Sequence, residues 1–176
     1  EEVVPPKEER ADIERRQEAR DNPVKEPENY KQAVEEYKST ELGGSENAKN
    51  KKDTLVNEAQ TEEGKAFVDN QVAQLERNED GTITVYRSGT LQDGHNPATT
   101  DKKTAELIAN ERKKQGLSSD IVEVNVNPSD ISVVVPGIES EVFIKIDSTN
   151  KDRIDNSTKK EQKTSEQLTT ERRGVK

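Results

Sequence analysis

The alternation of apolar and polar side chains is most regular between residues 82 and 147. Successive side chains of a strand point to opposite faces, so this alternation predicts strands. They are expected over residues 82–88, 120–127 and 141–147, and the apolar run of residues 131–135 predicts a further strand. In the first of them Ile83 and Val85 share one face with Arg87, while Tyr86 points to the other face.

The pattern changes after the first of these strands. Residues 89–98 are mostly polar and contain glycine, which predicts a loop with His95 exposed. Apolar positions then recur with helical spacing and predict a helix over residues 101–115, with Thr100 as its N-cap. The order strand, helix, strand, strand, strand with mostly short connections is typical of a small α+β unit with a mainly antiparallel sheet.

Helices are also predicted before this unit. Residues 28–40 carry Tyr30 and Tyr37 on one narrow apolar stripe, which suits packing on the chain's own domain or docking of a partner helix. Residues 64–77 present a broader apolar face that is expected to pack on the following strands. Residues 1–26 are so polar that they predict a solvated charged segment, either helical or disordered.

Four parts follow from these patterns. Residues 1–44 are expected to form a charged helical or extended arm, and residues 45–80 a helical segment that packs on the core. Residues 81–147 are expected to form that core. Residues 148–176 consist mainly of Ser, Thr, Asn, Lys and Glu and predict a polar tail without a core of its own.

The composition limits how much of the chain can pack around one core. Hydrophobic residues make up 27% of the 176 residues and charged residues 37%. A globular domain usually contains about 45–50% apolar residues, glycine included. Long flanks of the chain are therefore expected to be disordered, or to be ordered by partners.

Charge and residue usage exclude several classes of function. The net charge of -9 argues against nonspecific binding to nucleic acid or to a membrane surface, which both need a cationic field. The chain has no cysteine and one histidine, which leaves almost nothing for a zinc site, and we expect no metal. No apolar run approaches the roughly 20 residues of a membrane span.

Three separate elements bring polar groups to the ends of predicted strands or helices. Arg87 ends the first strand, Thr99 and Thr100 precede the helix, and Glu139 and Glu141 flank the start of the last strand. An extended segment would point the two glutamates the same way, and neighbouring carboxylates raise one another's pKa. Arginine, hydroxyl and paired glutamate suit a ligand that carries phosphates and a reactive ribose.

These motifs resemble those of a known enzyme family. Val85-Tyr86-Arg87-Ser88-Gly89, Ala98-Thr99-Thr100-Asp101 and Glu139-Ser140-Glu141-Val142-Phe143-Ile144 occur in the order and approximate spacing of the mono-ADP-ribosyltransferases. The chain is most similar to the branch with Arg, Ser-Thr-Ser and Glu-x-Glu motifs, found in bacterial toxins and bacteriophage effectors. The resemblance implies a split antiparallel β-sandwich with NAD in a central cleft, flanked here by long polar segments that are mainly helical or disordered.

The resemblance also implies a role for each motif residue. Arg87 would contact the NAD phosphates or the nicotinamide ribose, and Thr99 with Thr100 would brace the site. Glu141 would bind the ribose 2′-hydroxyl and stabilise the oxocarbenium-like transition state as nicotinamide leaves. Glu139 would orient or deprotonate the acceptor, typically a protein arginine. Such an enzyme would act in the cytoplasm of a host cell or be carried in a virion.

The sequence departs from the family at two points. Ala98-Thr99-Thr100 replaces Ser-Thr-Ser, and no aromatic residue precedes Glu139 in its loop, which leaves Tyr86 and Phe143 to stack on nicotinamide. An alternative is a non-catalytic structural or interaction protein, such as a virion or assembly component. It would have a degenerate copy of the fold, and its polar arms would lie along partner subunits.

Overall fold

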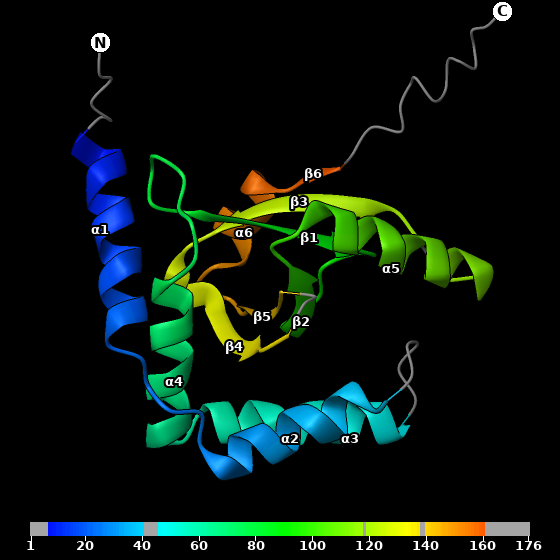
Figure 1. Ribbon diagram of the computed structural model, residues 1–176. Helices are drawn as coiled ribbons and strands as arrows, with labels where there is room; N and C mark the ends of the chain where they lie inside the picture. Colours follow the sequence, from blue (N-terminus) through cyan, green and yellow to red (C-terminus); the bar gives the residue numbers. More distant parts are fainter. Residues whose placement is uncertain (1–6, 41–45, 118, 138–139, 161–176) are drawn as a thin grey trace, which may run out of the picture.

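The computed structural model describes residues 7–40, 46–117, 119–137 and 140–160 (Figure 1). The described residues form a mixed α+β structure, as predicted. The helices are α1 (Lys7–Asp21), α2 (Glu28–Lys38), α3 (Glu46–Ala59), α4 (Glu62–Ala73), α5 (Lys102–Lys114) and α6 (Lys151–Ser157). The strands are β1 (Ile83–Ser88), β2 (Gly94–Thr99), β3 (Ile121–Val126), β4 (Ile131–Val135), β5 (Glu141–Ile146) and the two-residue β6 (Lys159–Lys160), and a 3-10 turn spans Pro128–Asp130.

The strands form one antiparallel sheet in the order β4-β5-β2-β1-β3-β6. The sheet is strongly curved: α3 and α4 pack beside β4, with α2 against α3, whereas α5 packs against β1, β2 and β3 (Figure 1). Ile83, Val85 and the alternate valines of β3 lie in its apolar core, as the period of two requires. Leu55 and Phe67 from the preceding helices are buried in the same core.

The middle of the sheet was not predicted. Residues 94–99, expected to be loop, form β2, which pairs with β5 along its whole length. Glycine, asparagine and proline usually mark loops, and proline is rare in central strands because it has no N–H. Here the side chain of the buried Asn96 forms the hydrogen bonds that the backbone of the preceding turn needs. Its amide group donates to the carbonyls of Gln92 and Gly94, and its oxygen accepts from the Gln92 N–H.

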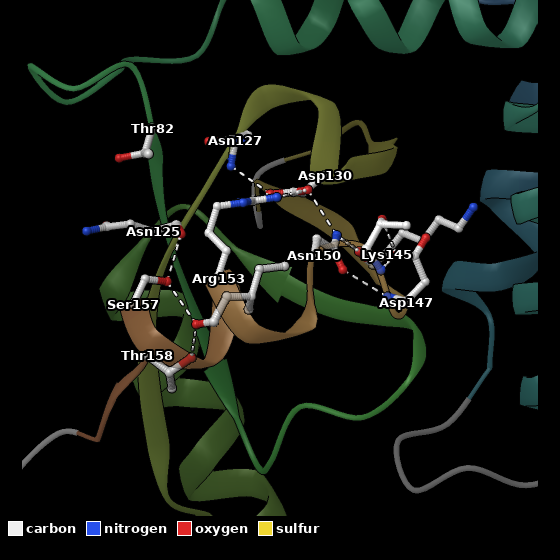
Figure 2. A network of polar contacts seen from close by, with 12 residues as sticks. Thr82, Asn125, Asn127, Asp130, Lys145, Asp147, Asn150, Arg153, Ser157 and Thr158 are labelled. Atoms are coloured by element: carbon white, nitrogen blue, oxygen red, sulfur yellow. Dashed lines mark hydrogen bonds and ion pairs between the residues drawn. The ribbon is translucent and has the colours of Figure 1, made fainter.

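The prediction of a tail without a core is wrong for residues 151–157, which form α6 with Ile154 fully buried. A single apolar residue among polar ones gave too weak a periodicity to predict this helix. What anchors α6 is a polar network, drawn in Figure 2. Residues 161–176 of the expected tail lie outside the described residues.

Asp130 is the centre of that network. Its carboxylate, 4% exposed, accepts two hydrogen bonds from the guanidinium of Arg153, at 2.8 and 2.9 Å. It also accepts from the Asn127 N–H at 2.8 Å and from the Asn150 side chain at 3.0 Å. Asn150 in turn donates to the Lys145 carbonyl (Figure 2). The turn before β4, the end of β5 and α6 are thus joined through one carboxylate.

Both edges of the sheet are closed by side chains or short segments. At the β4 edge the hydroxyl of the fully buried Tyr30 donates to the Val134 carbonyl and accepts from the Val134 N–H at 3.2 Å, in place of a neighbouring strand. At the other edge β6 pairs with two residues of β3, and the Ser157 hydroxyl donates to the Asn125 carbonyl. Unpaired edges promote association between copies, and these contacts reduce that exposure.

Replacing Tyr30 with Phe should destabilise the protein by about 1–3 kcal/mol, because the buried N–H and carbonyl of Val134 lose their partner. Chemical denaturation measures the effect. Tyr86→Phe is the matched control, since the half-buried Tyr86 faces away from the main core. Equal stability of Tyr30→Phe and Tyr86→Phe would show that the edge contact contributes nothing.

The Asp130 network should also make stability dependent on acid. Burial alone would raise the pKa of Asp130, but the hydrogen bonds from Arg153 and Asn150 outweigh burial and hold its pKa below the usual value. A carboxyl with a lowered folded pKa stabilises the fold above the unfolded value of about 4, and this contribution is lost as the pH falls through the folded pKa. Asp130→Asn should therefore lower stability at neutral pH and flatten its acid dependence. Asp152→Asn, exposed on α6, should leave both unchanged in denaturation series at several pH values.

Candidate functional site

Thr99 of β2 lies between the strands that carry the other two predicted motifs. It pairs with Tyr86 of β1 on one side and with Glu141 of β5 on the other, so the three residues form one row across the sheet. Directly paired residues point to the same face. Tyr86 belongs to the motif of Arg87, and Thr99 and Glu141 belong to the other two motifs. The three predicted motifs therefore lie on three adjacent strands, β1, β2 and β5.

Arg87 lies where β1 and β2 separate. The two strands are described throughout, and their ladder pairs Tyr86 with Thr99 alone. Beyond that pair the Arg87 guanidinium bridges the strands: it donates to the Pro97 carbonyl at 2.7 Å and to the Thr90 carbonyl at 3.1 Å. Burial and the nearby charge of Arg112 lower the pKa of Arg87. A half-buried guanidinium whose hydrogen bonds go to neutral carbonyls keeps its full positive charge.

Tyr37, from the last turn of α2, contacts β5 at the candidate site. Its hydroxyl donates to Glu141 Oε2 at 2.7 Å. Its ring packs edge-on against Phe143, with centroids 5.3 Å apart. Tyr37 therefore holds Glu141 and Phe143 of β5 from α2.

Thr99 and Thr100 have different positions. Thr99 is 3% exposed, and its hydroxyl accepts from the Asp101 N–H at 3.0 Å, which fixes the turn into α5. Thr100 was predicted to cap this helix, but the N-cap is Asp101, whose side chain accepts from the Lys103 N–H. The backbone N–H of Thr100 instead donates to the Ser140 carbonyl at 3.2 Å.

Ser140 breaks the expected geometry of the two glutamates. Its φ is +52°, a left-handed conformation that costs a non-glycine residue roughly 1–2 kcal/mol. The segment is thus not extended at Ser140, so the extended conformation from which the direction of the two glutamates was predicted is wrong at this residue. Glu139 itself lies outside the described residues. Strain of this kind is common at functional sites.

The two aromatic residues expected to stack on a ligand differ in exposure. Phe143 is fully buried beneath Tyr37, with the ammonium of Lys52 6.0 Å from its ring centroid, so it presents no free face. Tyr86 is half-buried and lines a surface hollow of about 380 Å³. The hollow is also lined by Leu75, Glu76, Asn78, Ile83, Thr84 and Thr100.

His95 extends this site along β2. It pairs with Lys145 of β5, and its Nδ1 lies 2.8 Å from the Ser132 hydroxyl, so it is half-buried and bonded rather than exposed as predicted. Burial lowers its pKa, and the charges of Lys145 and Lys52 lower it further. Lys52 is thus close enough to act on His95 as well as on Phe143.

Sequence reasoning missed Tyr37 and Lys52 as site residues because both precede the stretch that carries the motifs. Tyr37 was read as one position of an apolar stripe, and its hydroxyl gave no signal of a polar partner. The apolar stripe of α2 packs on the chain's own core, where Tyr30, Ala33 and Val34 are buried. Of the two roles predicted for the stripe, packing within the domain is therefore the one observed.

Comparison of the chain with protein-family models, with curated proteins and with solved structures finds no match. Within the described residues there is no group of three or more His, Cys, Asp or Glu side chains placed to hold a metal ion. None of the helices in the described part of the chain combines the length and apolar character that crossing a membrane requires.

The strained Ser140 leads to a prediction. Ser140→Gly should stabilise the protein by about 0.5–1 kcal/mol, because glycine adopts a positive φ without the Cβ clash, although it also makes the unfolded chain more flexible. Ser140→Ala keeps the clash and should give no gain. Thermal unfolding of both variants provides the comparison, and a gain in Ser140→Ala equal to that in Ser140→Gly would contradict the assignment of strain.

Proposed function

We propose that this protein is a mono-ADP-ribosyltransferase that transfers ADP-ribose from NAD to a protein acceptor, with arginine as the modified residue. One observation carries the proposal: Thr99 pairs with Tyr86, the neighbour of Arg87, on one side and with Glu141 on the other, so the motifs lie on three adjacent strands. Residues that are far apart in the sequence are thus neighbours in the sheet, which supports the proposal.

Each group has a chemical task in this proposal. Arg87 offers a positive charge to the phosphates or the nicotinamide ribose, and Thr99 holds the turn beside it. Glu141 binds the ribose 2′-hydroxyl and stabilises the positive charge that develops as the glycosidic bond to nicotinamide breaks. Glu139, for which no geometry is described, would orient the acceptor.

The separation of β1 from β2 agrees with the proposed fold. The pair Tyr86–Thr99 connects two halves of the sheet, β4-β5-β2 and β1-β3-β6. Beyond this pair β1 and β2 diverge, and the Arg87 side chain bridges them. A split antiparallel sandwich divides at such a point. The dinucleotide would bind where the two halves separate, close to Arg87. The protein would find its acceptor in a host cell, either directly in the cytoplasm or after delivery by a virion.

A second candidate is a structural or interaction protein with a degenerate copy of this fold. The observation in its favour is that α2 covers the site: Tyr37 is bonded to Glu141, and Lys38 donates to the Pro136 carbonyl at the end of β4. Assembly subunits would then be the partners, and stoichiometric copurification in a particle would support this candidate.

The test is incubation of the protein with labelled NAD and an arginine-bearing acceptor. Glu141→Gln should lose at least about 100-fold in rate, because it removes the charge that stabilises the transition state. Glu111→Gln, exposed on α5, should label the acceptor as the wild type does. Equal background labelling by the wild type and Glu141→Gln would rule out the transferase and leave the interaction protein.

A further inference from the structure

Two cations flank one cross-strand pair at the candidate site. Pro97 of β2 lies opposite Phe143 of β5. Arg87 reaches this pair from β1, donating to the Pro97 carbonyl at 2.7 Å. Lys52 reaches it from α3, with its ammonium 6.0 Å from the centre of the Phe143 ring. The two side chains thus approach the same part of the sheet from different elements.

Neither cation has a carboxylate partner among the described residues. No ion pair or hydrogen bond to a carboxylate is formed by either, although the chain carries 37 acidic residues and a net charge of -9. Lys51, the neighbour of Lys52, does pair with a carboxylate, that of Glu36, at 3.1 Å. Among the described residues the lack of an ion pair at Lys52 and Arg87 is therefore a local feature of this site, although the Asp53 carboxylate lies near Lys52.

Positive charge also accumulates around the pair. Burial lowers the pKa of Lys52, and the charge of Arg87 lowers it further, whereas the nearby Asp53 acts in the opposite direction. Arg112 lies against Gly89, with its Nη2 3.6 Å from the position a Cβ would occupy there, and its charge lowers the pKa of Arg87. Half-buried cations that repel one another are stabilised when an anion binds between them.

We propose that Lys52 and Arg87 together form a binding site for a phosphate-bearing ligand, and specifically for its diphosphate group. Arg87 supplies a planar fork of N–H donors, and Lys52 supplies a point charge on a flexible stem. The identity of the ligand as NAD rests on the proposed function, and the anion site itself does not. The site requires a residue of α3, so the helical segment before the sheet belongs to the binding machinery.

The experiment measures binding of inorganic pyrophosphate, and separately of ADP-ribose, to the full chain by calorimetry. Lys52→Met keeps the apolar stem against Phe143 and removes the charge. It should weaken binding about tenfold, the loss expected for one charge-assisted hydrogen bond. Lys52→Arg should retain most of the affinity. Lys65→Gln removes an equal charge from an exposed position on α4 and should bind as the wild type does.

The outcomes separate this inference from the proposed function. Wild-type binding that is weakened in Lys52→Met and kept in Lys65→Gln supports the anion site, even when no ADP-ribose is transferred. Absence of pyrophosphate and ADP-ribose binding by the wild type, or equal binding by Lys52→Met, overturns it. Transfer of ADP-ribose by Lys52→Met with an unchanged kcat/KM would likewise overturn it while leaving the transferase standing. Should Lys52→Met unfold, Lys52→Gln answers the same question.

Discussion

The pairing of β2 with its two neighbours determines the rest of the structure. On one side β2 is hydrogen-bonded to β5 from Gly94 to Thr99. On the other it meets β1 at the Tyr86–Thr99 pair, and beyond this pair the Arg87 guanidinium occupies the place of further ladder bonds. A side chain that bonds a strand carbonyl satisfies the backbone where the sheet opens. The Arg87 side chain thus both satisfies the backbone where β1 and β2 separate and places a positive charge between these strands.

A chain with few apolar residues folds here by using polar groups in place of apolar area. Asp130 joins the 3-10 turn to α6, Asn96 holds the turn before β2, and Tyr30 closes the edge of β4. Each of these groups is buried and bonded, which avoids the cost of an unsatisfied polar group. Asp130 is the one charged residue among the buried residues of the described part of the chain, so the acidic composition does not prevent a compact core.

The sequence predicted the elements with clear periodicity and failed where periodicity was absent. The apolar run in residues 131–135 gave the bounds of β4, and the apolar positions of β1, β3 and β5 lie in the core as expected. Residues 94–99 contain Gly94 and Pro97 and could not be recognised as a strand, because their pairing is imposed by neighbours distant in the sequence. Helix α6 was missed because Ile154 is its one buried residue, and a single apolar position gives no periodicity.

The candidate site was predictable in its motifs and not in its surroundings. Arg87, Thr99 and Glu141 could be selected from their order along the chain, whereas the conformation of Ser140 and the approach of Tyr37 and Lys52 depend on tertiary packing. Side-chain chemistry is visible in a sequence, but the partner that a hydroxyl or ammonium finds is not.

Helix α2 carries both Tyr30 and Tyr37, two turns apart, and so connects two properties that are usually separate. One tyrosine shields the backbone of an outer strand, and the other touches the carboxylate of Glu141. A change at Glu141 that moved α2 would also change how Tyr30 shields the backbone of β4. Because one helix makes both contacts, a ligand that displaced α2 from Glu141 would also uncover the Val134 backbone at the sheet edge.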